Sequence, residues 1–544
     1  NYSLSLHDAL PIFVEQVIRD DGAEQQKFIR IEAALGEASG QFTLSIAEFV
    51  RMSWPMRYLG ATAIIYAGHG VSDHARAAIQ MLSDNPQSTM VYEHSGWREI
   101  GDGRWVYLHA GGGIGPDGAQ EGVGVELPDH LSLYELPTPP AGDELKRAVT
   151  ATTRLVDLGK SPWSIAAFIA PFRAVLGQCD FTLHFAGPTG VFKSELAALV
   201  CQHFGPGLNS RNLPASWLST DNALEDLAFI AQDTILVVDD FAPSGPNQEV
   251  QRLNQKADRI IRHLGNHNSR GRMRQDGSLR PPRPPRGLIV STGEDLPVGH
   301  SLRARMVIVE IGPGDIEASK LTACQDDACA GLYARAMAGF VRWLAPQYSE
   351  VRAHLRNKVN DLRSQVRLRR CHRRTPDMIA SLGAALQMFI RFAEEAGVFD
   401  ADGAQAFWDR GWRDLLLLGE QQGQHHRSGD PAERFIELIN SAMVSGRAHL
   451  AGPEGEVPEG APEAYGWHQA DGGLRPCGAQ IGWVDGPDLY LDPDASYAVA
   501  RAAASGPDRL AMTPITLWKR LDQKRWLVRE ASRETLKVRR RLQG

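Results

Sequence analysis

The chain has 544 residues, of which 43% are hydrophobic and 23% are charged, and its formal net charge is −7 at pH 7. This composition is typical of a folded protein with a large core, and it excludes a disordered, collagen-like or uniformly basic chain. The length predicts three or four domains. No segment predicts a membrane span, because the most apolar window, 163–176, is short and contains Arg173.

The first residues and the cysteines bear on the setting of the protein. Residues 1–12 resemble the translation of a sequencing adapter and do not begin with methionine, so we expect an artefact there and a fragment of a longer protein. The cysteines form no Cys-x-x-Cys pair and lie at no zinc-binding spacing from histidines, which predicts reduced thiols in a cytoplasmic protein without structural zinc. They are Cys179, Cys201, Cys324, Cys329, Cys371 and Cys477.

Residues 13–143 predict a mixed α/β domain rich in short strands. The glycine run that ends at residue 115 is interpreted as tight turns and not as a dinucleotide site, because no helical pattern follows it. The expected elements are a hairpin (28–35 and 40–49), a helix (73–82) and paired strands near 94–98 and 105–109.

A phosphate-binding loop is the strongest functional signal. The apolar strand at 181–186 runs directly into Gly-Pro-Thr-Gly-Val-Phe-Lys-Ser, and a helical pattern follows. In such a loop, backbone amides and the helix N-terminus attract phosphate, the lysine reaches the β- and γ-phosphates, and the serine ligates Mg²⁺. The predicted ATP-binding residues are Gly187, Pro188, Thr189, Gly190, Val191, Phe192, Lys193 and Ser194. Phe192 departs from the motif, because a glycine is expected there and a Cβ limits the approach of phosphate.

A second apolar strand ends in two acids, Asp239 and Asp240. We expect this strand to lie beside the strand of the phosphate loop. In that arrangement Asp239 joins Ser194 in the Mg²⁺ shell, and Asp240 orients the attacking water. Because many motor ATPases carry Asp-Glu at this place, the shorter second acid, together with Phe192, puts fast hydrolysis in question.

Two further strands complete the pattern. The third ends at Ser291 and Thr292, which are suited to sensing the γ-phosphate, and the fourth follows Arg303 and Arg305. This order is typical of AAA+ ATPases, in which an arginine at the last place reaches the nucleotide of a neighbouring subunit. We therefore expect an ATP- and Mg²⁺-dependent ATPase that forms a homo-oligomer, such as a hexameric ring. The predicted catalytic residues are Lys193, Asp239, Asp240, Ser291, Thr292, Arg303 and Arg305.

Basic residues are concentrated in three tracks, 251–290, 351–374 and 518–544. In the first track an Asp-Gly turn signal at 276–277 predicts a hairpin just before the third strand. Hairpins at this place in helicases of superfamily three grip the phosphates of a nucleic-acid strand. The predicted nucleic-acid-binding residues are Arg272, Arg274 and Arg280. The alternative is an arginine loop that is solvated or paired with acids of a neighbouring subunit.

The remaining sequence extends this division into domains. The strand hairpin expected at 479–484 and 488–491, together with a helix that Thr513 caps, resembles a winged helix whose wing is expected at 526–529 and 535–540. The chain is thus predicted to be an α/β protein with a P-loop NTPase core. Its expected domains are 13–143 (mixed α/β), 144–314 (ATPase core), 315–428 (helical) and 429–544 (linker and winged-helix-like).

Several of these motifs together resemble a bacterial family of uncharacterised P-loop proteins that phages, plasmids and integrated elements carry, often near primases. The resemblance covers roughly residues 28–400. It rests on the segments at 94–97, 105–115, 187–199, 217–225, 235–243, 288–297 and 301–310. It implies a role in replication of a mobile element and assigns no role to Asn222 and Glu225, which belong to its fourth segment.

Three functions fit these patterns. The first is an ATP-driven motor on single-stranded DNA, such as a helicase or translocase of a mobile element's replication apparatus. The second is a slow nucleotide-gated module that binds DNA, a primase or other replication proteins. The third is a regulator whose winged helix binds DNA. No membrane partner is expected.

Overall fold

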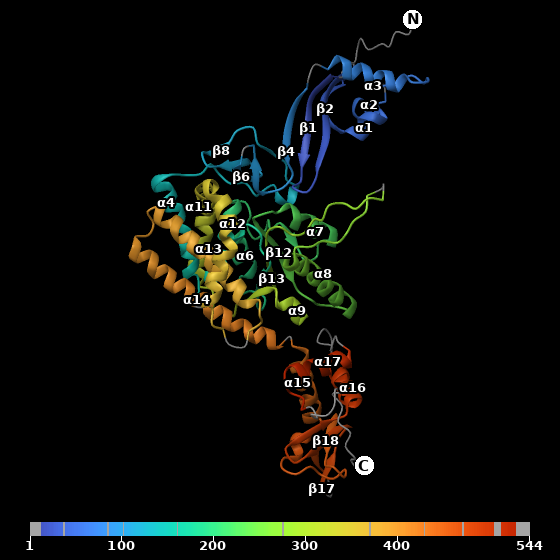
Figure 1. Cartoon of the computed structure of the whole chain (residues 1–544), viewed down its shortest axis with the longest axis vertical. Coiled ribbons are helices and arrows are strands. Elements are labelled where there is room, and N and C mark those ends of the chain that lie inside the picture. The colour runs from blue at the N-terminus through green and yellow to red at the C-terminus, as the bar shows by residue number, and fades with distance from the viewer. Residues whose placement is uncertain are drawn as a thin grey trace.

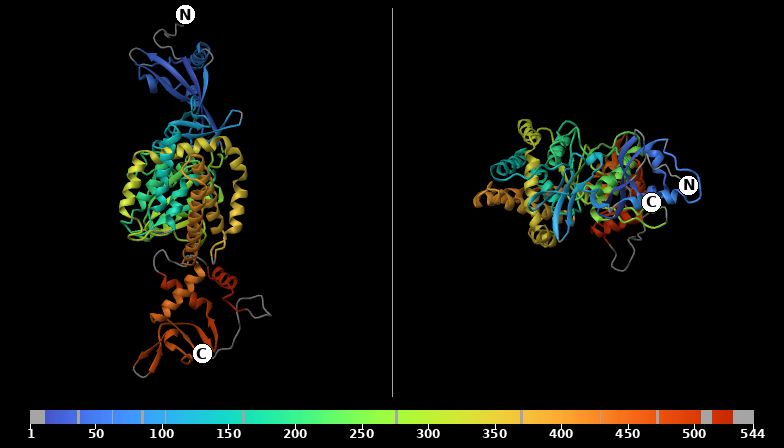
Figure 2. Two further views of the ribbon diagram at one scale, coloured as in Figure 1. Left: turned by 90° about the vertical axis from the view of Figure 1, so that its left-hand side faces the viewer. Right: turned by 90° about the horizontal axis from the view of Figure 1, so that it is seen from above.

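The computed structural model describes residues 12–528 except 36–37, 62, 84–85, 102, 160–161, 275–276, 369–370, 429, 471–472 and 505–512. Within this part the molecule is elongated, with a β-rich region at the N-terminal end, a large α/β body in the middle and a small α/β region at the C-terminal end (Figures 1 and 2). The mixed α/β class that the sequence predicts is confirmed. None of the helices in the described ranges is long and apolar enough to span a membrane.

The N-terminal region contains a mixed sheet with the order β3-β2-β1-β4-β9. Strands β1, β2 and β3 are antiparallel neighbours, whereas β1 with β4 and β4 with β9 are parallel. The expected hairpin is confirmed for β2 and β3, but its second strand stops at Ser45, whose side chain caps the next helix in a capping box with Glu48. The elements are β1 (Ile12–Asp20), β2 (Gln25–Leu35), β3 (Ala38–Ser45), α1 (Ile46–Arg51), α2 (Trp54–Leu59), α3 (Val71–Leu82), β4 (Gln87–Tyr92) and β9 (Gly124–Val125).

A second, antiparallel sheet joins this region to the body. Its order is β5-β6-β7-β8. The indole nitrogen of Trp97 donates to the carbonyl of Val175 at 2.7 Å, and the hydroxyl of Tyr107 donates to the carbonyl of Asp233 at 2.9 Å. The sheet is therefore fixed to the body by buried side chains. Its strands are β5 (Gly96–Ile100), β6 (Arg104–His109), β7 (Gly112–Gly115) and β8 (Gly118–Gln120).

The body is built on a parallel sheet with the order β11-β12-β13-β10-β14. The sequence predicts that the acidic strand lies beside the strand of the phosphate loop, and this is wrong: β13 pairs with both and separates them. Sequence order alone does not fix the neighbours in a sheet whose strands connect through helices. The strands are β10 (Thr182–Ala186), β11 (Ala215–Ser216), β12 (Ile235–Phe241), β13 (Leu288–Gly293) and β14 (Met306–Glu310).

Helices surround this sheet and share one hydrophobic core with it. The ring of Phe168 packs against Phe389 at 4.8 Å and Phe407 at 5.8 Å, so the boundary expected near residue 314 divides a continuous core. The side chain of Gln422 bonds both the amide and the carbonyl of Ile308 at 2.8 Å and so covers the edge strand β14. The helices are α4 (Gly142–Thr153), α5 (Trp163–Ala174), α6 (Lys193–Cys201), α7 (Asp221–Ile230), α8 (Asn247–Asn266), α9 (His300–Arg303), α10 (Ala318–Cys329), α11 (Leu332–Leu344), α12 (Tyr348–Gln365), α13 (Thr375–Glu395) and α14 (Ala401–Ser428).

The C-terminal region has its own core and a small sheet with the order β15-β18-β19. The expected strand hairpin is confirmed as β18 and β19, and Thr513 caps α17 as predicted, by accepting from the amide of Thr516. Most of the expected wing, from residue 529 on, lies outside the described residues. The elements are α15 (Pro431–Val444), β15 (Ala448–Ala451), β16 (Trp467–Ala470), β17 (Gly473–Pro476), β18 (Ala479–Asp485), β19 (Asp488–Leu491), α16 (Pro493–Ala503) and α17 (Pro514–Gln523).

Candidate functional site

The glycine-rich loop connects the carboxyl end of β10 to the first residue of α6, as the sequence predicts. Gly187 approaches the end of β14 so closely that a Cβ would lie 2.2 Å from the carbonyl oxygen of Ile311. Lys193 donates from Nζ to the carbonyl of Pro188 at 2.8 Å, across the exposed mouth of the loop. The positive end of the α6 dipole and this ammonium group therefore face the same opening, which favours an anion there.

Phe192 adopts a left-handed backbone conformation, with φ 65° and ψ 26°, immediately before α6. A side chain in this region costs roughly 1–2 kcal/mol, and glycine avoids most of that cost. The ring is 43% exposed, so burial of the ring does not compensate for the strain. Phe192 therefore replaces the expected glycine while keeping the left-handed backbone conformation that favours glycine, and it is strained for that reason.

The two acids at the end of β12 lie in a β-bulge. Val238 pairs with Ser291, and the next pair is Phe241 with Gly293, so Asp239 and Asp240 together oppose the single residue Thr292. Asp240 has φ 67°. Consecutive side chains of a regular strand point to opposite faces, whereas a bulge changes their directions. The bulge therefore brings the Asp239 carboxylate and the Asp240 amide to the same residue, Thr292.

Three oxygen-bearing side chains converge at this edge of the sheet. The hydroxyl of Ser194 donates to Oδ1 of Asp239 at 2.9 Å, and the hydroxyl of Thr292 donates to the same oxygen at 2.5 Å. The amide of Asp240 donates to the Thr292 hydroxyl at 3.0 Å. The structure thus brings together the loop serine, the Asp239 carboxylate, the backbone amide of Asp240 and one of the two predicted sensor residues.

Ser291, the other predicted sensor, lies in the interior. Its hydroxyl accepts from the indole nitrogen of Trp217 at 2.9 Å and lies 3.0 Å from Nδ1 of His184. Burial lowers the pKa of His184 to about 4, so this ring is neutral at pH 7. Adjacent residues of β13 point to opposite faces, which places Thr292 at the site and Ser291 behind it.

Glu294 belongs to the polar end of the third predicted strand, which suits γ-phosphate sensing, but it is not among the predicted catalytic residues. Its amide donates to the carbonyl of Phe241 at 3.1 Å, and the amide of Gly187 donates to the carbonyl of Gly293 at 3.2 Å. The hydroxyl of Thr189 donates to the Glu294 carboxylate. The segment that carries Glu294 is therefore attached to both the phosphate loop and the acidic strand. The Glu294 carboxylate lies at the mouth of the loop, in addition to the aspartates at the end of β12.

The predicted finger arginines contact other parts of the chain. The guanidinium of Arg305 donates to the carbonyl of Ser301 at 2.6 Å and to Asn266 at 2.9 Å, and Arg303 donates to the carbonyl of Pro297 at 3.1 Å. The carbonyl of Arg305 accepts from the first residue of β10. Arg305 therefore lies at the amino edge of the sheet, about 16 Å, or one five-residue strand, from the phosphate loop.

The side chains around the loop fit the two groups that the sequence predicts there, ATP and Mg²⁺. Hydroxyl and carboxylate oxygens are the ligands that Mg²⁺ prefers, and Ser194 and Asp239 supply one of each within hydrogen-bond distance of each other. The exposed loop, Lys193 and the start of α6 fit a triphosphate. No cluster of three or more His, Cys, Asp or Glu side chains suited to a metal ion exists in the ranges that the structure describes.

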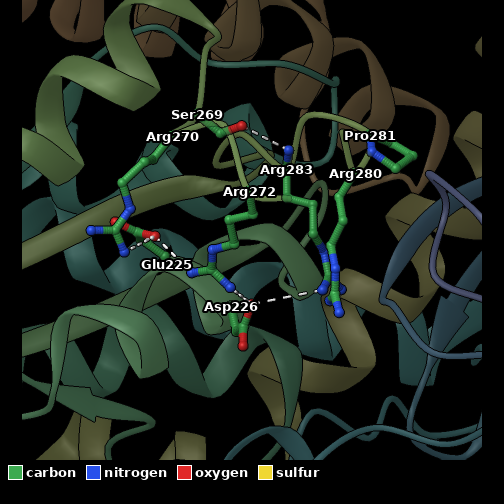
Figure 3. Close-up of a pocket in the computed structure, with 8 residues that line it drawn as sticks. All are labelled: Glu225, Asp226, Ser269, Arg270, Arg272, Arg280, Pro281 and Arg283. Carbon is green, nitrogen blue, oxygen red and sulfur yellow. Dashed lines mark hydrogen bonds and ion pairs between the residues drawn. The ribbon is translucent and has the colours of Figure 1, made fainter. Parts of the chain in front are cut away.

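The predicted basic hairpin forms, although its tip, 275–276, lies outside the described residues. Met273 pairs with Leu279, the amide of Arg274 donates to the carbonyl of Ser278 at 2.8 Å, and that of Arg280 donates to the carbonyl of Arg272 at 2.8 Å. A small pocket at its base is lined by Glu225, Asp226, Ser269, Arg270, Arg272, Arg280, Pro281 and Arg283 (Figure 3).

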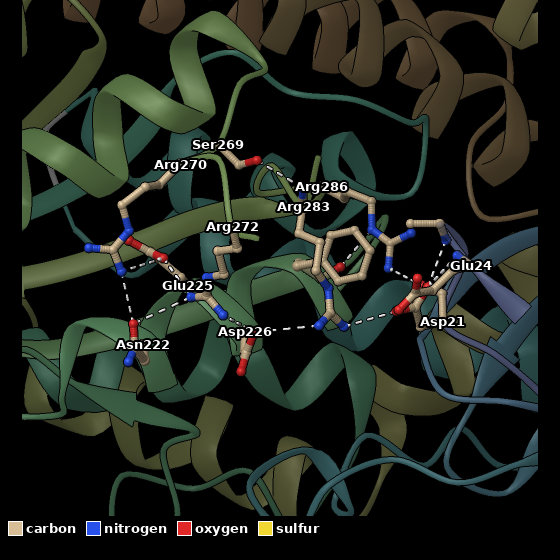
Figure 4. A network of polar contacts seen from close by, with 12 residues as sticks. Asp21, Glu24, Asn222, Glu225, Asp226, Ser269, Arg270, Arg272, Arg283 and Arg286 are labelled. Atoms are coloured by element: carbon tan, nitrogen blue, oxygen red, sulfur yellow. Dashed lines mark hydrogen bonds and ion pairs between the residues drawn. The ribbon is translucent and has the colours of Figure 1, made fainter. Parts of the chain in front are cut away.

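Two residues without an assigned role, Asn222 and Glu225, contact the arginines at the base of the hairpin (Figure 4). The Glu225 carboxylate accepts from Arg272 at 2.8 Å and lies 3.6 Å from Arg270, and the Asn222 side chain accepts from Arg270 at 2.9 Å. Helix α7 therefore anchors the hairpin. Arg274 and Arg283 contact acids of the N-terminal region, Glu24 and Asp21.

Residues 146–284, which include the loop, β12 and the hairpin, match the family model described as "Domain of unknown function (DUF927)". The structure is similar to "SCCmec type IV Cch - active helicase", with a TM-score of 0.57 and 14% sequence identity over 96% of this chain and 92% of that chain. That similarity shows a common fold. The family match and this structural similarity support the predicted resemblance in two respects. The first is a match to a family of unknown function, and the second is the fold of a protein described as a helicase.

A second structure, of JCV helicase with a bound acetamide compound, has a TM-score of 0.24 and 15% identity over 44% of this chain and 66% of that chain. This score is too low to define a common fold. No curated protein sequence matches the chain.

Proposed function

We propose that the chain is an ATP-driven helicase or translocase that acts on single-stranded DNA, within the replication apparatus of a mobile element. The convergence of Ser194, Asp239 and Thr292 beside the loop that carries Lys193 is the observation that carries the proposal. The fold that the chain shares with a protein described as a helicase supports the motor class.

In this proposal the residues divide the chemistry among them. Lys193 exchanges its bond with the Pro188 carbonyl for the β- and γ-phosphates. Ser194 and Asp239 would hold Mg²⁺, which would supply positive charge to offset the negative charge of the phosphates. Thr292 orients Asp239 and holds the amide of Asp240. Asp240, which is exposed, is then in a position to orient water.

The predicted arginine finger requires a second subunit. Arg305 lies at the edge of the sheet opposite its own phosphate loop, and its guanidinium is held by Ser301 and Asn266. We therefore propose a homo-oligomer in which Arg303 or Arg305 approaches the neighbouring subunit's nucleotide. A ring would also bring the hairpins of its subunits together around one strand.

The strained Phe192 supports a second candidate function. The left-handed phenylalanine strains the backbone of the loop in the conformation that would bind phosphate. Such strain lowers the affinity for nucleotide and suits a slow nucleotide-gated module that binds DNA or a primase. The C-terminal region, in which Thr513 caps α17, supports DNA or protein binding by a winged-helix-like domain in either case.

ATP hydrolysis with and without single-stranded DNA, with Lys193→Ala as the blank, tests the proposal. We expect DNA to stimulate turnover in the wild type and the variant to lose both turnover and stimulation. ATP binding without DNA-stimulated turnover would support the slow module instead. Turnover that survives in Lys193→Ala would remove the assignment of the site.

A further inference from the structure

The turn between β1 and β2 lies against the arginine hairpin of the body (Figure 4). The Glu24 carboxylate accepts from Arg274, and the Asp21 carboxylate lies 3.1 Å from a terminal nitrogen of Arg283. Arg286 donates to the main-chain carbonyl of Asp21 at 2.9 Å. One short turn of the N-terminal region thus contacts three arginines that precede β13.

The turn is built to hold its carboxylates in place. Oδ1 of Asp21 accepts from the amides of Ala23 and Glu24, both at 2.8 Å, and Oδ1 of Asp20 accepts from the amide of Gly22 at 2.7 Å. Gly22 has φ 86°, and a Cβ there would lie 2.3 Å from the guanidinium of Arg286. A glycine is therefore needed for the close approach of the turn to the arginines.

The arginines are also held in place before any ligand arrives. The guanidinium of Arg283 lies 4.4 Å, and that of Arg286 3.7 Å, from the centre of the Phe229 ring. Arg270 and Arg272 are held separately by Asn222 and Glu225 of α7. The base of the hairpin therefore belongs to the body, whereas Arg274 and Arg283 are shared with the N-terminal region.

We propose that Asp21 and Glu24 act as an internal mimic of nucleic-acid phosphates, which occupies Arg274 and Arg283 until single-stranded DNA displaces it. This inference rests on the proposed function. A guanidinium uses the same forked N–H groups for a carboxylate and for a phosphodiester, so both anions cannot hold them at once. Displacement frees the N-terminal sheet from one of its attachments to the body, which couples strand binding to the position of that region.

How strongly Asp21 and Glu24 lower the affinity for DNA depends on the fraction of molecules in which they contact Arg274 and Arg283. If the acids contact the arginines most of the time, only the remaining fraction of molecules can bind DNA there. The apparent dissociation constant for DNA is then the intrinsic constant divided by that fraction. Two partly exposed ion pairs are compatible with a 3- to 10-fold effect, as a rough estimate. Salt weakens the acidic contact and the DNA contact together, so the difference is expected to be largest at low ionic strength.

The test compares Asp21→Asn/Glu24→Gln with the wild type in the full chain, by anisotropy of a labelled oligothymidine over a series of salt concentrations. Asparagine keeps the Oδ1 acceptor on which the turn depends. Glu15→Gln/Glu32→Gln removes the same charge from the same sheet, where Glu15 pairs with Arg30 and Glu32 bonds Gln41, and serves as the matched control. Glu24→Gln alone is the second variant, in case the double variant does not fold.

We expect the double variant to bind the oligonucleotide roughly 3- to 10-fold more tightly than the wild type, and more tightly than the control by the same factor. Equal affinity of the double variant and the control, with binding by the wild type, would overturn the inference and leave the DNA function in place. If neither the wild type nor the double variant binds, both the inference and the proposed DNA function are wrong. A gain in the double variant from an undetectable wild-type affinity would support the inference.

Discussion

The hydroxyl of Ser194 donates to Asp239 at 2.9 Å although the two residues lie 45 positions apart in the sequence. A loop residue and a strand-end acid that bond directly in this way hold the two oxygens that a single Mg²⁺ ion would need. Thr292 donates to the same carboxylate oxygen, so Asp239 is fixed from two sides.

Asp239→Asn is therefore expected to remove Mg²⁺-dependent turnover without loss of the fold. The amide keeps the oxygen that accepts both hydroxyls but loses the charge that attracts the metal. We expect turnover to fall by at least about 100-fold, measured as steady-state ATP hydrolysis over a range of Mg²⁺ concentrations. Asp258→Asn, which removes a carboxylate paired with Arg262 on α8, is the control. Equal Mg²⁺ dependence in Asp239→Asn and the control would contradict the metal assignment.

Phe192→Gly is expected to be more stable than Phe192→Ala. Both variants lack the exposed ring, but only alanine keeps a Cβ in the left-handed conformation at φ 65°. The difference is expected to be about 1 kcal/mol in favour of glycine, after the larger loss of chain entropy that glycine suffers on folding. Thermal denaturation of the two variants measures it, and ATP titration should show tighter binding by Phe192→Gly. Equal melting temperatures would mean that the loop relaxes around alanine.

The sequence predicted what lies at the ends of the strands better than how the strands are arranged. The loop at 187–194 and the acids after β12 follow from local patterns, and the structure brings Ser194, Asp239 and Thr292 together. The place of β13 between β10 and β12 depends on how the connecting helices cross the sheet, which no local pattern encodes.

Other features of the site depend on tertiary contacts in the same way. The bulge that brings the Asp239 carboxylate and the Asp240 amide to Thr292 needs the register with β13. The contact of Glu24 with Arg274 joins residues 250 positions apart. The only local signals for that contact were the glycine in the β1–β2 turn and the acids on either side of it.

Glu294→Gln is expected to lower turnover more than nucleotide affinity. Its carboxylate bonds Thr189 at the mouth of the loop, and its amide bonds the end of the acidic strand. A carboxylate at that place can accept a proton from water or orient it, a contribution that is typically 10²- to 10⁴-fold. We expect a fall of about 10-fold or more in kcat, with an unchanged dissociation constant for ATP. Glu249→Gln, on the first turn of α8, is the control. A loss of affinity with unchanged kcat would assign Glu294 to the structure of the loop.

Arg280→Ala is expected to weaken binding of single-stranded DNA without loss of stability. Arg280 is exposed, and among the described residues it has no carboxylate partner, unlike Arg272 and Arg274. Loss of one phosphate contact should lower the slope of log affinity against log salt by about 1. Arg259→Ala, which removes an arginine paired with Asp221 on the neighbouring helix, should leave this slope unchanged. An unaltered slope in Arg280→Ala would place the DNA contact elsewhere.

Acid is expected to destabilise the folded chain well above the pH at which its surface carboxylates titrate. Burial lowers the pKa of His94, His109, His184 and His203 to about 4. The unfolded chain therefore binds more protons than the folded chain between about pH 4 and 6.5, and the free energy of unfolding falls as the pH falls through that window. Between pH 7 and 5 each histidine contributes about 2 kcal/mol to this loss, as an order of magnitude.

Asp233 opposes this trend, because burial raises its pKa to about 6 and its folded form gains a proton as the pH falls. Four histidines outweigh one aspartate, so the melting temperature should fall from pH 7 to pH 5. His203 lies in the core, 4.7 Å from the ring of Tyr333, and His203→Gln should reduce that fall, whereas His74→Gln, at an exposed position on α3, should not. Scanning fluorimetry at the two pH values measures both. A melting temperature that stays constant or rises toward pH 5 would mean that the buried imidazoles are protonated in the folded chain.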